Sequence, residues 1–336
     1  MTAESQPTAE SLWLARFAKL VVAATFGLIF IGGHTTTSGA GMAFPDWPLS
    51  NGSLNPTGWL HNFMMLLEHG HRLTAGTVMT LVLVLFAWTL RRRRSLPRAA
   101  VPLAACALLG VFSQAILGGL RVILDPQGIE ATTSTIATTF RILHGCFAQI
   151  ELCLVVSLAA VLSPVWPRLT AQPTFRRVAR IGWVTTGFVF LQLIAGATMR
   201  HLGAGLAIPT YPLTPDGAIM PKVHNAFVDL NFTHTRVLAL LVTIHVLLLA
   251  RRALVSGEVR LARPALLLLA LLVAQVLMGM FVIWHLRPPL LTTLHVVNGA
   301  ALFATTVFIA VRASRAPHGD SPSEPASDFH LTEATA

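Results

Sequence analysis

Charged residues are scarce in this chain. Only 11% of its 336 residues are Asp, Glu, Lys or Arg, against about a quarter in ordinary soluble domains, whereas 54% are hydrophobic. The sequence also lacks a phosphate-binding glycine loop, a dinucleotide-binding fingerprint and a nucleophile elbow. These absences argue against the common soluble nucleotide-binding and hydrolase domains.

Cysteine is rare as well. Cys106, Cys146 and Cys153 all fall inside apolar runs and form no CxxC pair, so neither a disulfide framework nor a zinc site is indicated. The first residues are polar and include Glu4 and Glu10, unlike a secretory signal or a basic transit peptide. This pattern favours a multi-pass protein of the bacterial inner membrane.

Long apolar runs dominate the rest of the chain, and each is long enough to cross a bilayer as a helix. We therefore predict an all-α polytopic membrane protein whose main surroundings are the lipid bilayer. The eight predicted transmembrane helices lie at approximately 18–33, 64–90, 99–120, 140–163, 178–200, 232–250, 264–285 and 291–312.

The net charge of +10 is distributed unevenly. Of the 24 Lys and Arg residues, 17 lie in alternate loops or next to the termini, which predicts that both termini are cytoplasmic. Membrane topology thus accounts for the charge, and no nucleic-acid partner is expected. The other seven are expected at the outer face as candidates for binding an anionic partner: Arg72, Arg121, Arg141, Arg200, Lys222, Arg236 and Arg287.

An internal repeat divides the chain. GAGMAFPDWPL at 39–49 matches GAGLAIPTYPL at 203–213, and a QxxxG motif at 114–118 matches one at 275–279. The repeat predicts two pseudo-symmetric four-helix bundles. The expected divisions are a cytoplasmic N-terminal segment (1–17), a first half (18–163), a cytoplasmic linker (164–177), a second half (178–312) and a disordered, Ser- and Pro-rich cytoplasmic tail (313–336).

Four histidines occupy equivalent places at the starts of alternate spans. They are His71, His144, His234 and His295. A lone histidine at a helix mouth is more often an interfacial residue, but two pairs in repeat-related positions favour bis-imidazole ligation of haem iron. Arg72 and Arg236, close by in sequence, could bind haem propionates in bidentate fashion.

Carboxylates near these histidines have two interpretations each. Glu68 lies three residues before His71 on the same helix face. It is either an acid/base group or a carboxylate stabilised at the helix N-terminus by the helix dipole. Glu151 lies two turns after His144. It is either a functional group or a protonated carboxyl that hydrogen-bonds a neighbouring helix. The roles of Glu151 and of His245, inside the sixth span, stay open.

The stretch Glu68, His71, Arg72, together with the repeated loops, the QxxxG helices and the later histidines, resembles the haem A synthase family over residues 18–312. That family oxidises a ring methyl of haem O to the formyl group of haem A, through an alcohol and a gem-diol. The resemblance implies that His71 and His144 ligate the substrate haem and that Glu68 is the catalytic glutamate. It also implies that His234 and His295 ligate a resident haem b.

The chain departs from the family pattern at three points. The first outer loop, 34–61, lacks the cysteine pair that many members carry, and Thr36 stands where they have an arginine. The sixth-span motif reads His234-Thr235-Arg236 instead of His-Arg.

Two alternatives remain beside a haem A synthase. One is a di-haem b-type electron-transfer protein, and the other is a haem-binding assembly or transport protein without turnover. Glu68 favours the synthase, because a pure electron carrier needs no acid/base group beside iron. The synthase interpretation implies a haem O synthase and an unidentified electron donor as partners, with homo-oligomerisation open.

Overall fold

The computed structural model describes residues 9–125, 134–166, 169 and 173–315, and these residues are helical with irregular connections and no β-strand. Eight helices are long and apolar enough to cross a membrane, which confirms the predicted all-α fold class. The helices are α1 (Ala9–Thr37), α2 (Phe63–Arg91), α3 (Ala100–Ile123), α4 (Thr135–Val161), α5 (Pro173–His201), α6 (Ala226–Phe232), α7 (Ala239–Leu254), α8 (Val259–Trp284) and α9 (Pro289–Ala313). A π-helical turn, Thr233–Leu238, joins α6 to α7 in one continuous span.

Most helices are longer than the apolar runs that predict them. α1 begins at Ala9 instead of residue 18, and α9 begins at Pro289 instead of residue 291. Hydropathy marks only the lipid-buried part of a helix, whereas backbone hydrogen bonding continues into the interface. Residues 9–17 of the predicted N-terminal segment thus belong to α1, while residues 1–8 and 316–336 lie outside the described residues.

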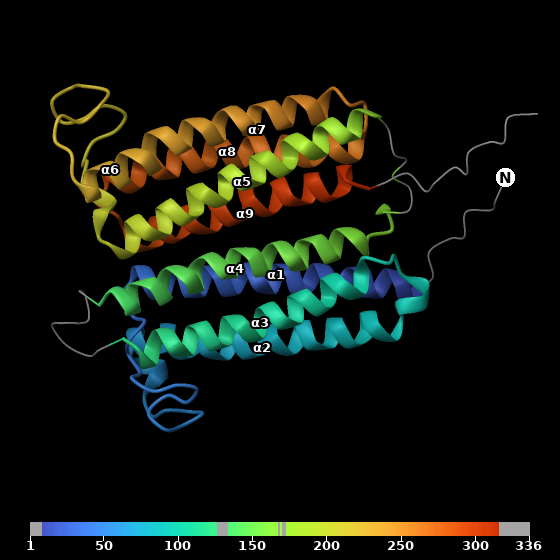
Figure 1. Cartoon of the computed structure of the whole chain (residues 1–336). Helices are drawn as coiled ribbons and strands as arrows, with labels where there is room; N and C mark the ends of the chain where they lie inside the picture. Colours follow the sequence, from blue (N-terminus) through green and yellow to red (C-terminus); the bar gives the residue numbers. More distant parts are fainter. Residues whose placement is uncertain (1–8, 126–133, 167–168, 170–172, 316–336) are drawn as a thin grey trace, which may run out of the picture.

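The helices form two four-helix bundles that lie side by side (Figure 1). Helices α1 to α4 make the first bundle, and the α6–α7 span with α5, α8 and α9 makes the second. Each bundle has its own apolar core, around Leu85 and Leu158 in the first and around Leu249 and Leu268 in the second. A smaller cluster that includes Leu152 joins the two bundles.

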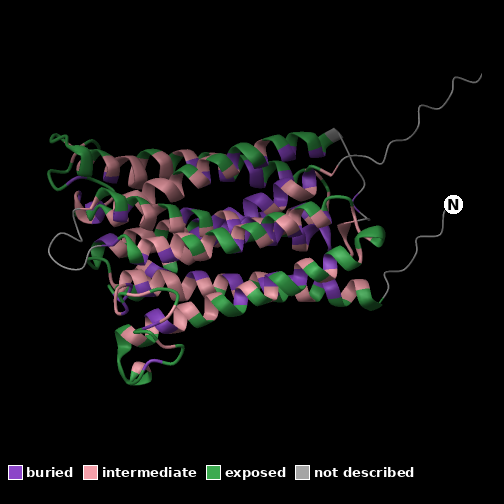
Figure 2. Cartoon of the chain, turned by 60° about the horizontal axis from the view of Figure 1, so that its bottom comes forward, coloured by how far each residue is buried: buried purple, intermediate pink, exposed green. Residues whose placement is uncertain are grey.

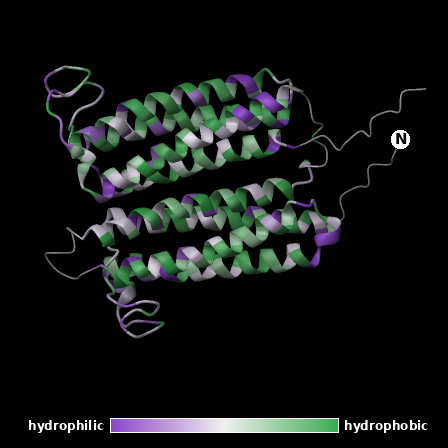
Figure 3. Ribbon diagram, in the orientation of Figure 1, coloured by the Kyte–Doolittle hydropathy of each residue, from purple (hydrophilic) through white to green (hydrophobic). Residues whose placement is uncertain are grey.

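Apolar side chains also cover the outward faces of the bundles. Figure 3 shows hydrophobic residues along the helices on their outer sides, and Figure 2 shows that many outward residues are exposed. Leu109 and Leu240, for example, are 68% and 61% exposed. Such surfaces are stable against lipid tails, as expected of a multi-pass membrane protein.

The loops that carry the repeated motif lie at one end of the bundles, opposite the α2–α3 connection and the start of α1 (Figure 1). The basic loops predicted to be cytoplasmic lie at that opposite end, around Arg92–Arg94 and Arg251–Arg252. The end that carries the motif loops is called the outer end below, in keeping with the predicted topology.

The predicted topology can be tested by labelling cysteines. In a variant without the three native cysteines, Lys222→Cys in the outer loop should react with a membrane-impermeant maleimide on intact cells, because Lys222 is 78% exposed. Arg98→Cys, exposed in the α2–α3 connection, should react only after permeabilisation. The reverse pattern would place the termini outside the cytoplasm.

Candidate functional site

Asparagine caps set the depth of two of the four histidines. Oδ1 of Asn62 accepts hydrogen bonds from the main-chain N–H groups of Met64 and Met65 at the start of α2, at 3.0 and 3.2 Å. Asn225 caps α6 in the same way. His71 and His234 each follow their cap by nine residues, so both lie in the third turn from the outer end.

All four histidines pack their rings against a glycine of the preceding helix. The pairs are Gly32–His71, Gly118–His144, Gly196–His234 and Gly279–His295. A Cβ atom at Gly32 or Gly196 would lie 2.7 Å from the Cε1 atom of the paired ring. At Gly118 or Gly279 this distance would be 3.1 Å. Any larger residue would therefore push the imidazole away, so glycine sets where each ring can lie.

The first bundle brings His71 and His144 together. Their ring centroids are 6.4 Å apart and the rings are nearly perpendicular, at 86°. Since a metal–imidazole nitrogen bond is about 2 Å long, this separation suits two imidazoles that bind one metal ion from opposite sides. His295 and His234 are likewise electrostatic neighbours in the second bundle.

The polar atoms of these rings fit a bound metalloporphyrin. The Nδ1 atom of His71 is buried without a hydrogen-bond partner among the described residues, and Nε2 of His295 lies 3.2 Å from the side-chain nitrogen of Gln275. No group of three or more His, Cys, Asp or Glu side chains in the described part of the chain could hold a bare metal ion. Two imidazoles per bundle are the donor set of a six-coordinate haem, so the residues present fit haem.

His234 has an additional contact that orients its ring. Its Nδ1 donates to the carbonyl of Gln192 at 3.2 Å, and Nε2 of Gln192 donates back to the carbonyl of His234 at 2.9 Å. An Nδ1–H group bound to a carbonyl leaves the lone pair on Nε2, which is how ligating histidines are held in metal sites.

Glu68 is buried, with 3% of its surface exposed, and both of its oxygens accept hydrogen bonds. Oε2 accepts from the main-chain N–H of Phe44 at 3.0 Å, and Oε1 accepts from Nη2 of Arg72 at 2.6 Å. The carboxylate thus has a fixed orientation one turn from His71 and ties the first outer loop to α2.

The side chain of Arg72 binds main-chain carbonyls of the same loop. It donates to the carbonyl of Asp46 at 2.8 Å, to that of Leu49, and to that of Phe44 at 3.3 Å. The guanidinium, predicted to bind a propionate, therefore makes its contacts in this structure with the outer loop and Glu68.

Arg236 binds the second outer loop in the same way. It donates to the carbonyls of Thr210 at 2.9 Å and Leu213 at 3.4 Å, the repeat equivalents of the two carbonyls nearest to Arg72. The extra residue Thr235 between His234 and Arg236 lies in the π-helical turn, which encloses one more residue per hydrogen-bonded ring than an α-helix. The turn thus absorbs the sequence departure and brings Arg236 to the same loop positions.

Asn231 is the structural counterpart of Glu68, six residues after its cap, and it was not singled out from the sequence. It is fully buried, and its Nδ2 donates to the carbonyls of Ala204 at 3.0 Å and Gly205 at 3.2 Å. The equal distance from the two asparagine caps is the signal that could have identified it. A carboxylate in one bundle and a neutral amide in the other is the main chemical difference between the two sites.

Comparison with known proteins gives the family. The model of the family described as cytochrome oxidase assembly protein matches residues 15–307. The chain belongs to this cytochrome oxidase assembly protein family. Among its relatives are proteins named heme A synthase from Azorhizobium caulinodans (28% identical, covering 92% of this chain and 93% of the relative), Symbiobacterium thermophilum (28%; 79% and 82%) and Methylobacterium radiotolerans (28%; 80% and 80%).

The sequence leaves the roles of two further residues of this family member open. Glu151 is buried against Gly110, and neither of its oxygens has a hydrogen-bond partner among the described residues. His245 donates from Nδ1 to the carbonyl of Leu241 at 2.8 Å and packs its ring 4.2 Å from that of Phe188. These contacts satisfy His245 locally.

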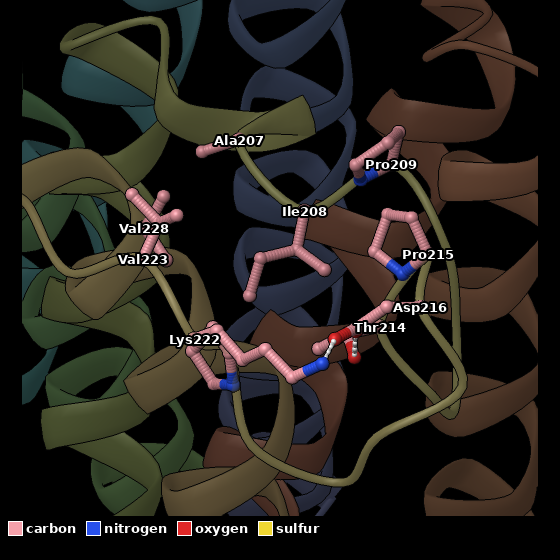
Figure 4. Close-up of a pocket in the computed structure, with 10 residues that line it drawn as sticks. Ala207, Ile208, Pro209, Thr214, Pro215, Asp216, Lys222, Val223 and Val228 are labelled. Atoms are coloured by element: carbon pink, nitrogen blue, oxygen red, sulfur yellow. Dashed lines mark hydrogen bonds and ion pairs between the residues drawn. The ribbon is translucent and has the colours of Figure 1, made fainter.

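A cavity of about 330 Å³ lies in the second outer loop (Figure 4). Its lining includes Ile208, Pro215 and the ion pair between Lys222 and Asp216, at 2.8 Å. The hydrogen bond from Lys222 lowers the pKa of Asp216 to about 2. None of the four paired histidines lines this cavity, so it is separate from the histidine sites of this family member.

The glycine contacts yield a test with matched controls. Gly196→Leu should displace the His234 ring and lower the iron-porphyrin content of the purified protein several-fold, because overpacked side chains cannot share that space. Gly187→Leu on the same helix should keep its porphyrin, since nothing lies within 4 Å of Gly187. Pyridine haemochrome absorbance per protein measures both, and full haem content in Gly196→Leu would contradict the role of this glycine.

Proposed function

We propose that this protein is a haem A synthase, which oxidises a methyl group on the haem O ring to the formyl group of haem A by successive hydroxylations, for cytochrome oxidase. The observation that carries the proposal is Glu68, a buried carboxylate one turn from the His71–His144 pair. The names of the relatives support the same activity. We further propose that the protein acts in the bacterial inner membrane with both termini in the cytoplasm.

The two bundles would divide the work. His71 and His144 would hold haem O as the substrate, and His234 and His295 would hold haem b. When bound, haem b supplies one-electron redox chemistry. The difference between Glu68 and Asn231 supports this division, because the carboxylate of Glu68 can exchange a proton whereas the amide of Asn231 cannot.

Glu68 would act as the acid/base group of the reaction. The N–H of Phe44 and the guanidinium of Arg72 hold its two oxygens in place, and each oxygen keeps a second lone pair for a proton. Burial under the outer loop keeps bulk water away from the carboxylate, which strengthens its interactions with nearby charges.

A di-haem electron carrier is the second candidate. The repeated ring-against-glycine packing would serve two resident haems equally well. The asymmetry between Glu68 and Asn231 favours the synthase, because two sites with the same electron-transfer task would not need different groups at this position. A haem O synthase and an electron donor are the partners that the synthase function requires.

Removal of the carboxylate tests the activity. Co-expressed with a haem O synthase in a host that lacks haem A, Glu68→Ala and Glu68→Gln should retain the haem b spectrum but form no detectable haem A, since neither variant can exchange the proton. Chromatography of the extracted haems measures the product. Normal haem A output from either variant would remove Glu68 from the mechanism.

Removal of the histidines tests the division of labour. His234→Ala and His295→Ala should each lose the resident haem b, whereas His71→Ala should keep it and lose only haem A formation. Absorbance spectra of the purified variants separate these outcomes. Equal haem losses from substitutions in both bundles would favour the di-haem carrier.

A further inference from the structure

Two arginines pack against the second glycine of the repeated GAG loop, one in each bundle. Nη1 and Cζ of Arg121, near the end of α3, would lie 3.0 Å from a Cβ atom at Gly41, and Nη2 is closer still. Cδ and Nη1 of Arg287 would lie 3.1 and 3.4 Å from a Cβ atom at Gly205. The absence of a side chain at both glycines lets a guanidinium lie directly on the loop main chain.

Arg121 lies at the outer rim of the first histidine pair. It follows Gly118, against which His144 packs, by three residues and so shares the same face of α3. At 1.5 Å per residue, its Cα is about 4.5 Å further toward the outer end. A planar ligand held between His71 and His144 would therefore have Arg121 at its outer edge.

Three other arginines at this end already have partners. Arg72 is bonded to the loop and Glu68, Arg141 forms an ion pair with Asp125, and Arg200 donates to the carbonyl of Gly33 at 3.1 Å. Arg121 has neither a hydrogen bond nor an ion pair among the described residues, although Glu68 and Asp125 are among its charged neighbours. A partly buried guanidinium with unused donors is suited to a carboxylate ligand.

Arg287 reaches its glycine through an unusual backbone. Leu286 and Arg287 both have positive φ angles, 56° and 64°, and they reverse the chain between α8 and α9. The side chain of Arg287 likewise has no hydrogen bond or ion pair in the described part of the protein. Leu286 and Arg287 thus hold a conformation that non-glycine residues seldom adopt, and it brings the guanidinium to Gly205.

We propose that Arg121 and Arg287 bind porphyrin propionates, Arg121 those of the substrate haem in the first bundle and Arg287 those of the haem in the second. Arg72 and Arg236 would instead position the outer loops. This inference rests on the proposed function for the identity of the ligand, a dicarboxylate porphyrin. The repeat supports it independently, because equivalent loop glycines receive an arginine from different places in the sequence.

The experiment compares ferric protoporphyrin IX with its dimethyl ester, which lacks the two negative charges. Both are titrated into the purified full-length protein that carries its resident haem, and Soret difference spectra give the two Kd values. Arg121→Gln should weaken binding of the diacid about 10-fold, the cost of one charge-assisted contact, and leave the Kd of the ester unchanged. Arg121→Lys should fall between wild type and Arg121→Gln. Lys222→Gln, an exposed cation of the second outer loop, should leave both Kd values unchanged.

The ratio of ester to diacid Kd decides the outcome. An unchanged ratio in Arg121→Gln, whether both porphyrins bind normally or both bind more weakly, would overturn the proposal. If Arg121→Gln loses the resident haem spectrum and so fails to fold, Arg121→Lys alone decides by the same ratio. Turnover is not needed: a changed ratio in a protein that forms no haem A would sink the proposed activity and leave the propionate assignment standing.

Discussion

The packing of an imidazole ring against a glycine on the neighbouring helix is the contact on which both sites depend. It occurs four times, at Gly32, Gly118, Gly196 and Gly279, and each time it fixes how closely two helices approach at the outer end. A glycine has no Cβ, so the ring occupies the volume that a side chain would fill. In a lipid bilayer, where helices gain little from the hydrophobic effect, such close approach also brings backbone and ring into favourable van der Waals contact.

The outer loops are held by buried polar contacts that cross from loop to helix. Glu68 and Arg72 bind one loop, and Asn231 and Arg236 bind the other. The two arginines donate to equivalent loop carbonyls, whereas Glu68 accepts from the N–H of Phe44 and Asn231 donates to the carbonyl of Ala204. Each loop thus satisfies carbonyl or N–H groups that would be costly to bury alone. The two sets of contacts differ in chemistry, because one includes a carboxylate paired with Arg72 and the other a neutral amide. Under the proposed function, this difference would distinguish the reactive site from the electron-storing site.

The arginines of the outer end fall into two groups by their contacts. Arg72 and Arg236 are committed to loop carbonyls, so their proximity to the histidines in sequence reflects loop anchoring in this structure. Arg121 and Arg287 have unused donors and lie against glycines of the same loops. The geometry therefore separates positioning arginines from candidate ligand-binding arginines, a distinction that residue type and position in the chain do not make.

The sequence by itself determined the eight spans, the two-fold repeat and the four paired histidines, because apolar length, repeated motifs and residue spacing are local properties of the chain. Tertiary structure alone decided which glycine faces each histidine, that Asn231 is the counterpart of Glu68, and that a π-helical turn realigns Arg236. It also decided that Arg121 and Arg287, 166 residues apart in the sequence, meet equivalent glycines. Such pairings join residues far apart in the chain, and they follow from the way helices pack, which no local pattern encodes.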